Sequence, residues 1–198
     1  MDNLSKEILG SWIQAIGTVI AAIGSTPSNV ISSDLLYDLD IWGNVLQATG
    51  NALQADDQGK IPLLVRIGNE VQSIGNVTVF AGLVIDFEQE TEQKLIITGN
   101  WLQALGALVL VGDELEKETI ADQSINIIGN LLQVIGNSLQ ALSGVYELEQ
   151  VRNKYKDFKN LEKHINSESL KVSGSWIQAV GSVISLIGQI IVEEKKIN

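Results

Sequence analysis

The sequence contains no cysteine, only two prolines and a single histidine among its 198 residues. The absence of cysteine excludes disulfides, thiolate chemistry and the usual structural zinc sites, and it is compatible with a reducing or an oxidising compartment. The scarcity of proline, together with a hydrophobic content of 45%, favours a folded helical protein. A chain of this length is expected to form one domain over residues 1–198.

Basic residues are also scarce, because 13 Lys and Arg stand against 24 Asp and Glu and give a formal net charge of −11. Phosphate backbones are held by an excess of Lys and Arg, so nucleic acid is not expected as a partner. The main basic cluster, from Arg152 to Lys163, is interrupted by Asp157 and Glu162. We interpret it as a solvated helix face, with binding of a polyanion or a lipid headgroup as the alternative.

No pattern that carries catalysis or binds a cofactor is present. His164 is the only histidine, whereas protein metal sites need clustered His, Cys or carboxylate groups. Asp38 and Asp40 resemble the start of a calcium loop but lack its later ligands. Phosphate-binding glycine loops and nucleophile elbows are missing. The chain is therefore predicted to be non-enzymatic, with no cofactor and no metal.

One phrase, Gly-(Ser/Asn)-x-aliphatic-Gln-small-x-Gly, occurs six times and organises the chain. Within each copy the glycines recur every seven residues, which is two helical turns, so they lie along one stripe of a helix. A seven-residue period on a strand would scatter them over both faces. The repeat cores cover residues 10–24, 43–55, 68–82, 99–112, 129–142 and 174–188.

The glycine stripe is predicted to mediate helix packing or assembly. A glycine inside a helix costs about 1 kcal/mol relative to alanine, so fifteen periodic glycines need a structural compensation. Close approach of two helix backbones supplies it, and the adjacent Gln amides can hydrogen-bond across the contact. The predicted residues are Gly10, Gly17, Gly43, Gly50, Gly68, Gly75, Gly99, Gly106, Gly129, Gly136, Gly174, Gly181, Gln14, Gln47, Gln72, Gln103, Gln133 and Gln178.

The opposite arc of each helix carries large apolar side chains and is expected to form the core. Because the glycine-bearing face has almost no charge, we expect the helices to be buried on two sides. Core filling is also the first interpretation of the four tryptophans, and anchoring at a membrane interface is the alternative. The expected core residues include Trp12, Ile13, Ile16, Trp101, Leu102, Leu105, Trp176, Ile177 and Val180.

These patterns predict an all-α, up-and-down bundle of six glycine-striped helices. Residues 145–166 add an amphipathic segment, either as a helix of its own or as a continuation of the fifth. Pro27 and Pro62 mark turns, with Ser28 or Asn29 and Asp57 expected to start the helices that follow.

Two functional hypotheses follow. The first is a structural protein that packs through its Gly/Asn/Gln faces into a homo-oligomer or filament. The alternative is a membrane-active bundle, pore-forming or membrane-inserting, because four uncharged runs approach the ~20 residues that span a bilayer. A constitutive multi-spanning protein is not favoured, since two further runs have only 15 residues and the mean hydropathy is +0.17. The uncharged runs cover residues 8–33, 95–112, 123–146 and 172–192, and the short ones 41–55 and 71–85.

At GSWIQAIG and its five relatives the chain resembles a group of repetitive proteins of unknown function from spore-forming, Bacillus-like bacteria. The resemblance covers the repeat phrases over most of the chain. It implies no activity and no site residues, only a spore-associated or secreted structural role. Asp2 and Glu7 beside Lys6 are not typical of a signal peptide. A cytoplasmic or spore-associated location is favoured, with non-classical export as a further option.

Overall fold

The computed structural model describes residues 3–56, 61–116, 120–153 and 167–197. These residues form six α-helices and no strand, so the predicted all-α fold is confirmed. The helices are α1 (Asn3–Gly24), α2 (Ser33–Ala55), α3 (Leu63–Val84), α4 (Gln89–Glu116), α5 (Ile120–Asn153) and α6 (Ser167–Ile197).

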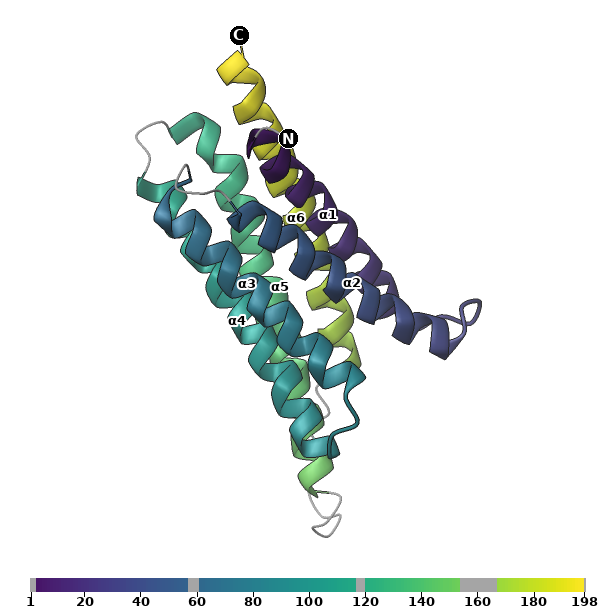
Figure 1. The fold of residues 1–198 in the computed structure, drawn as a ribbon. Coiled ribbons are helices and arrows are strands. Elements are labelled where there is room, and N and C mark those ends of the chain that lie inside the picture. Colours follow the sequence, from purple (N-terminus) through teal and green to yellow (C-terminus); the bar gives the residue numbers. More distant parts are fainter. Residues whose placement is uncertain (1–2, 57–60, 117–119, 154–166, 198) are drawn as a thin grey trace.

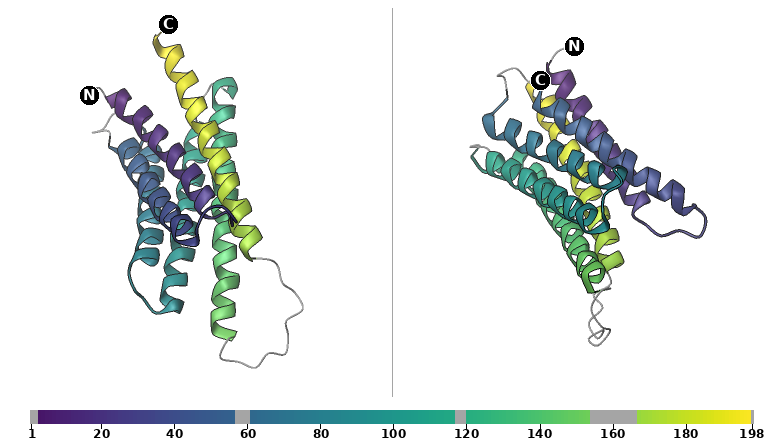
Figure 2. Two further views of the ribbon diagram at one scale, coloured as in Figure 1. Left: turned by 90° about the vertical axis from the view of Figure 1, so that its right-hand side faces the viewer. Right: turned by 60° about the horizontal axis from the view of Figure 1, so that its bottom comes forward.

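Consecutive helices run antiparallel as three hairpins, α1–α2, α3–α4 and α5–α6 (Figure 1). The hairpins are joined by contacts of α2 with α3 and of α4 with α5, and α1 packs against α6. Within the described part of the chain, each helix therefore packs against two others, and the six helices close into a ring. Figure 2 shows the same arrangement from two further sides, with α1 and α6 side by side. We call this arrangement the six-helix ring.

The ends of the helices follow local signals in part. The Ser32 side chain accepts a hydrogen bond from the backbone N–H of Leu35 at 3.3 Å and caps α2. The predicted start at Ser28 or Asn29 is wrong, because Ser28 instead accepts hydrogen bonds from the next backbone N–H groups in a turn. Pro62 directly precedes α3, as its missing N–H allows. Asp57 lies outside the described residues.

The amphipathic segment begins as part of α5, which continues without a break to Asn153. Residues 145–153 thus continue the fifth helix, which is the second of the two arrangements expected for residues 145–166. The rest of that segment, from residue 154 to 166, lies outside the described residues, and so do His164 and most of the basic cluster.

The interior of the ring holds small and polar side chains. Its buried apolar residues are mostly alanines, such as Ala22, Ala107 and Ala141, each 0% exposed. The largest side chains that are fully buried are amides, among them Gln72, Gln133 and Asn137. The usual arrangement, with large apolar residues inside and amides outside, is therefore reversed.

The expected apolar core stripe is wrong, because its residues point outward. Trp12 is 49% exposed, Trp101 44% and Leu105 52%, and Ile16, Trp176 and Val180 are exposed as well. Ile13, Leu102 and Ile177 are only half-buried. The helices are thus buried on one side, not two. The reason is steric, since backbones that approach at glycine leave room between them for small and flat side chains but not for a tryptophan.

Candidate functional site in the polar interior

The repeat glycines lie where paired helices touch. A Cβ built on Gly50 of α2 would lie 2.5 Å from the carbonyl oxygen of Gly10 in α1, and one built on Gly106 of α4 would lie 2.5 Å from that of Gly68 in α3. Real side chains do not approach backbone this closely, so alanine does not fit at either position without a shift. The remaining pairs are Gly17 with Gly43, Gly75 with Gly99, Gly129 with Gly181 and Gly136 with Gly174.

The pairing joins the first glycine of one repeat to the second glycine of the next. In an antiparallel hairpin this register brings the residues between the glycines to the same height. Gln14, between Gly10 and Gly17, is therefore level with Gln47, between Gly43 and Gly50. The same reasoning places the repeat glutamines of the other two hairpins level with each other. Close glycine contacts thus determine the position of the amides.

The six repeat glutamines point into the ring and are almost completely buried. Their exposed fractions lie between 1% for Gln133 and 7% for Gln14. Hydrophobic burial alone does not favour such a layer, because an amide taken out of water costs free energy unless it is hydrogen-bonded. We call these residues the glutamine layer: Gln14, Gln47, Gln72, Gln103, Gln133 and Gln178.

Hydrogen bonds in the glutamine layer join helices that are not neighbours in the ring. Gln14 of α1 donates to Gln133 of α5 at 3.0 Å. Gln178 of α6 donates to Gln47 of α2 at 2.8 Å and to Gln103 of α4 at 3.2 Å. Side-chain hydrogen bonds therefore connect helices across the centre of the six-helix ring, where their backbones do not contact each other.

Further amides and hydroxyls extend this network along the ring. Gln54 donates to Gln14 at 2.9 Å, and Gln140 donates to Gln178 at 2.8 Å. Gln133 also donates to Ser185 at 3.2 Å. Polar interactions thus continue on both sides of the glutamine layer, and the network is a property of the whole interior.

Buried residues directly after the glycines complete the interior, and the sequence analysis did not select them. Asn51, Asn76 and Asn137 follow the second glycine of their repeats and are 0% or 1% exposed. The available signal was the seven-residue period, because each of these asparagines lies seven residues after the Ser/Asn position of its repeat phrase. It was not used because a helical wheel places this position toward the edge of the stripe, where burial depends on a third helix.

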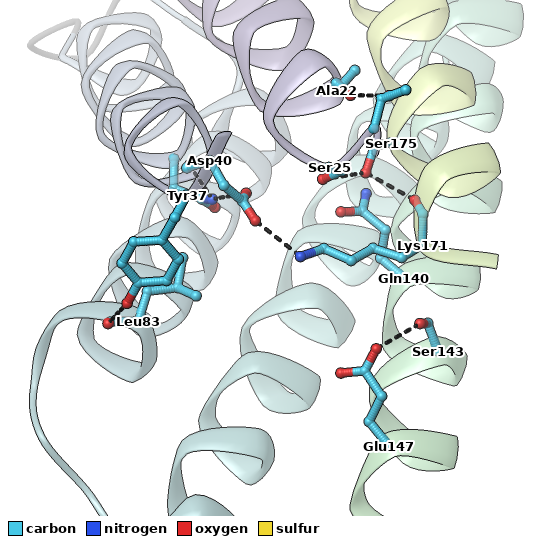
Figure 3. Close-up of polar contacts among 12 residues, drawn as sticks. Ala22, Ser25, Tyr37, Asp40, Leu83, Gln140, Ser143, Glu147, Lys171 and Ser175 are labelled. Atoms are coloured by element: carbon cyan, nitrogen blue, oxygen red, sulfur yellow. Dashed lines mark hydrogen bonds and ion pairs between the residues drawn. The ribbon is translucent and has the colours of Figure 1, made fainter. Parts of the chain in front are cut away.

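Charged side chains lie toward the ends of the ring. Lys6 pairs with Asp56 at one end at 2.9 Å. At the opposite end, Arg152 pairs with Glu90 at 2.7 Å and Lys171 with Asp40 at 3.0 Å. Figure 3 shows the Lys171–Asp40 pair next to the hydrogen bond of Ser175 to Ser25. Two charged zones therefore bound a stretch whose interior is lined by neutral polar groups.

A conventional reaction centre does not emerge from the described residues. They contain no group of three or more His, Cys, Asp or Glu side chains placed to hold a metal ion. Asp38 and Asp40 both lie near the start of α2, and Asp40 is used by Lys171 and by Asn44, whose amide donates to its carboxylate at 3.2 Å. The polar groups of the interior are mainly amides, which both donate and accept hydrogen bonds.

A family model described as a family of unknown function, DUF6944, matches residues 5–186. The match includes all six repeat phrases, and its description names no activity. It also names no source, so the resemblance to proteins of Bacillus-like bacteria stays a prediction. No curated protein and no solved structure matched the chain. The chain belongs to the family of unknown function DUF6944.

Proposed function

We propose that this chain is a non-enzymatic, membrane-inserted helical ring. The observation that carries the proposal is the outward exposure of large apolar side chains on all six helices. Examples from the middle of four helices are Ile16 at 49%, Leu105 at 52%, Ile135 at 49% and Ile187 at 47% exposed. A protein surrounded by water rarely exposes apolar side chains around its whole circumference, whereas lipid tails accept them.

The interior also fits a lipid environment. Helices in a bilayer gain no hydrophobic free energy by packing together, so they associate through small residues and interhelical hydrogen bonds. The glycine pairs, such as Gly10 with Gly50, and the bond of Gln178 to Gln47 are contacts of these two kinds. A polar interior inside an apolar exterior is stable where the exterior does not meet water.

Length and composition support insertion for three of the helices. The segments Lys6–Gly24, Gln89–Glu116 and Ser167–Lys195, in α1, α4 and α6, are long and apolar enough to cross a membrane. Average hydropathy counts both faces of a helix, so the buried amides of α2, such as Gln47 and Asn51, lower its value although they face inward. The uncharged run of α2 rises only about 22 Å against a hydrocarbon thickness of ~30 Å, which requires local thinning of the bilayer.

The positions of the tryptophans fit the two interfaces of a membrane. Trp12, Trp42, Trp101 and Trp176 are between 41% and 61% exposed. Each lies two to seven positions after the nearest preceding charged residue of its helix. Because α1 runs opposite to α2, α4 and α6, Trp12 lies toward one end of the ring and the other three toward the opposite end. Tryptophan is enriched at both membrane interfaces, which agrees with this distribution.

Self-assembly, the first of the two hypotheses from the sequence, is the competing proposal. Its original basis was the glycine stripe, and these glycines contact each other within the chain. A homo-oligomer or filament would instead have to cover the outward apolar faces. Those faces favour association with an apolar partner. Because they occur on all six helices, lipid is favoured, since it can cover the whole circumference of the ring.

The test is reconstitution with lipid vesicles. The purified chain is mixed with phosphatidylcholine vesicles, floated on a density gradient and assayed for release of an entrapped dye at neutral and acidic pH. We expect the protein to float with the vesicles and to need detergent to stay monodisperse without lipid. A defined multimer that is stable in detergent-free buffer and does not float would contradict membrane insertion and favour self-assembly.

A further inference from the structure

We propose that the interior of the six-helix ring is a hydrated path that lets water and small uncharged hydrogen-bonding solutes cross the bilayer. This inference rests on the proposed membrane insertion. It starts from buried polar atoms that have no hydrogen-bond partner among the described residues. They include Oδ1 of Asn51, Asn69 and Asn76, both amide atoms of Asn137, Nε2 of Gln72 and Oγ of Ser182.

The orientation of two of these amides is dictated by the helix that carries them. Asn69 donates its amide N–H to the carbonyl of Val65 at 3.0 Å, and Asn76 donates to the carbonyl of Gln72 at 3.0 Å. A carbonyl oxygen only accepts, so the amide nitrogen must face it. The Oδ1 atoms therefore point away from their own helix. Both side chains are at most 2% exposed, so these oxygens are directed into the protein.

These atoms are distributed along the ring and do not form a single pocket. In α3, Asn69 and Asn76 lie on either side of Gln72 and are seven residues apart, which is about 10 Å along the helix. Asn137 follows Gln133 in α5, which runs parallel to α3, so it lies on the same side as Asn76. Asn51 follows Gln47 in the antiparallel α2 and lies on the side of Asn69. The unpartnered groups thus extend through the glutamine layer.

Leaving such groups unpaired is unfavourable, and more so in a surrounding without water. Water is the natural partner because it can donate to the oxygens of Asn51, Asn69 and Asn76 and accept from Gln72. Buried waters typically make about three such hydrogen bonds to groups that the protein leaves unsatisfied. Because the unpartnered groups follow one another along the ring, successive waters bound to them would form a chain through the interior.

The groups that line this path favour neutral solutes over ions. The glutamine layer and Asn51, Asn76 and Asn137 carry no formal charge, and the ion pairs lie toward the ends of the ring. An ion must exchange its hydration shell for a ring of carbonyl oxygens or charged groups to pass. Here many amide oxygens already accept hydrogen bonds from other amides, as Gln47 and Gln103 do from Gln178. The interior therefore offers neutral hydrogen-bond donors and acceptors, and its described residues form no dedicated ion site.

The chain has no cysteine, so single thiols report the surroundings of chosen positions. Ser182 and Val183 are adjacent at the middle of the uncharged run of α6, but Ser182 is 3% exposed and Val183 37%. Ser182→Cys places a thiol of similar size in the interior, and Val183→Cys places one on the outer face. Both variants are reconstituted in vesicles and treated with iodoacetamide, a small uncharged reagent that attacks the thiolate. The thiolate forms in water and not in hydrocarbon.

We expect Ser182→Cys to be alkylated roughly tenfold or more faster than Val183→Cys, because thiolate forms only in the hydrated position. Protection of both thiols would mean an inserted protein with a dry interior, which contradicts the path and leaves the proposed insertion intact. Fast alkylation of Val183→Cys would mean that the outer face meets water, which contradicts the insertion itself. Vesicle flotation of each variant checks that it still inserts.

Osmotic shrinkage measures the path directly. Vesicles that contain the wild-type chain should shrink faster than protein-free vesicles when sucrose is added outside, without an increase in potassium leakage. Asn137→Leu should return the rate toward that of protein-free vesicles, since leucine offers no hydrogen bond. Ile135→Leu, on the outer face of the same helix, is the control and should not change it. Shrinkage of wild-type vesicles at the protein-free rate would overturn the proposal, and potassium leakage would overturn its restriction to neutral solutes.

Discussion

Gln178 of α6 donates a hydrogen bond of 2.8 Å to Gln47 of α2, although α1 lies between these two helices in the ring. The two side chains meet inside the ring, where they are 5% and 2% exposed. Because Gln178 also donates to Gln103 of α4, a single amide connects three helices that have no backbone contact with one another. The closed ring therefore depends on interior amides as well as on glycine contacts.

The first prediction concerns this connection. Gln178→Leu keeps a side chain of similar size but removes the donor to Gln47 and Gln103 and the acceptor for Gln140. Each stranded buried group costs about 1 to 3 kcal/mol, so the midpoint of thermal unfolding should fall clearly. Gln150→Leu, at an exposed position of α5, is the control and should leave it nearly unchanged. An equal effect of both variants would contradict the role of the network.

The second prediction concerns the glycine contacts. A Cβ on Gly136 would lie 2.6 Å from both the backbone nitrogen of Gln178 and the carbonyl oxygen of Gly174. Gly136→Leu, and likewise Gly106→Leu, should therefore destabilise the fold by about 1 to 3 kcal/mol or more, although leucine is the better helix former. Denaturant unfolding measures the loss.

Gly112 supplies the matched control for that experiment. It also lies in a helix, but a Cβ built on it meets no atom within 4 Å. Gly112→Ala should stabilise the protein by up to about 1 kcal/mol, because only helix propensity changes. If Gly136→Leu also unfolds at or above the wild-type midpoint, the close contacts do not limit stability and the glycines need another explanation.

The third prediction concerns the outer face. Leu105 is 52% exposed and lies near the middle of the uncharged run of α4. In water Leu105→Lys should leave stability almost unchanged, whereas a lysine at the centre of a membrane-spanning helix costs about 2.5 to 3.5 kcal/mol on insertion scales. We therefore expect less protein to float with vesicles, while helicity in detergent by circular dichroism stays the same. Unchanged flotation would indicate that this face does not contact lipid.

The fourth prediction concerns the ion pair at one end of the ring. Lys171 and Asp40 are 3.0 Å apart, and their side chains are 40% and 14% exposed. A double-mutant cycle with Lys171→Met and Asp40→Asn should give a coupling free energy of about 1 kcal/mol, since a partly exposed pair is screened by solvent. Added salt should reduce the coupling. If the two single effects simply add, the pair does not help to hold α6 and α2 together across the ring.

The sequence by itself determined the helices, the glycine stripe and the amides beside it. A seven-residue period defines one face of a helix through local geometry alone, so the twelve glycines and six glutamines could be named without a structure. The antiparallel order of the helices also follows from short connections. Helix starts were less predictable. Ser28 and Ser32 can both cap a helix, but Ser28 stabilises the turn after Pro27 and Ser32 caps α2.

Only the tertiary structure decided which face of each helix lies inside. A helical wheel separates Trp12 from Gln14 but assigns neither to the interior, because that choice depends on the neighbouring helices and on the surrounding medium. Backbones that touch at Gly10 and Gly50 enclose a space suited to amides, and the tryptophans are therefore outside. Asn51, Asn76 and Asn137 become buried for the same reason, since their position at the edge of the stripe is covered only when a third helix closes the ring.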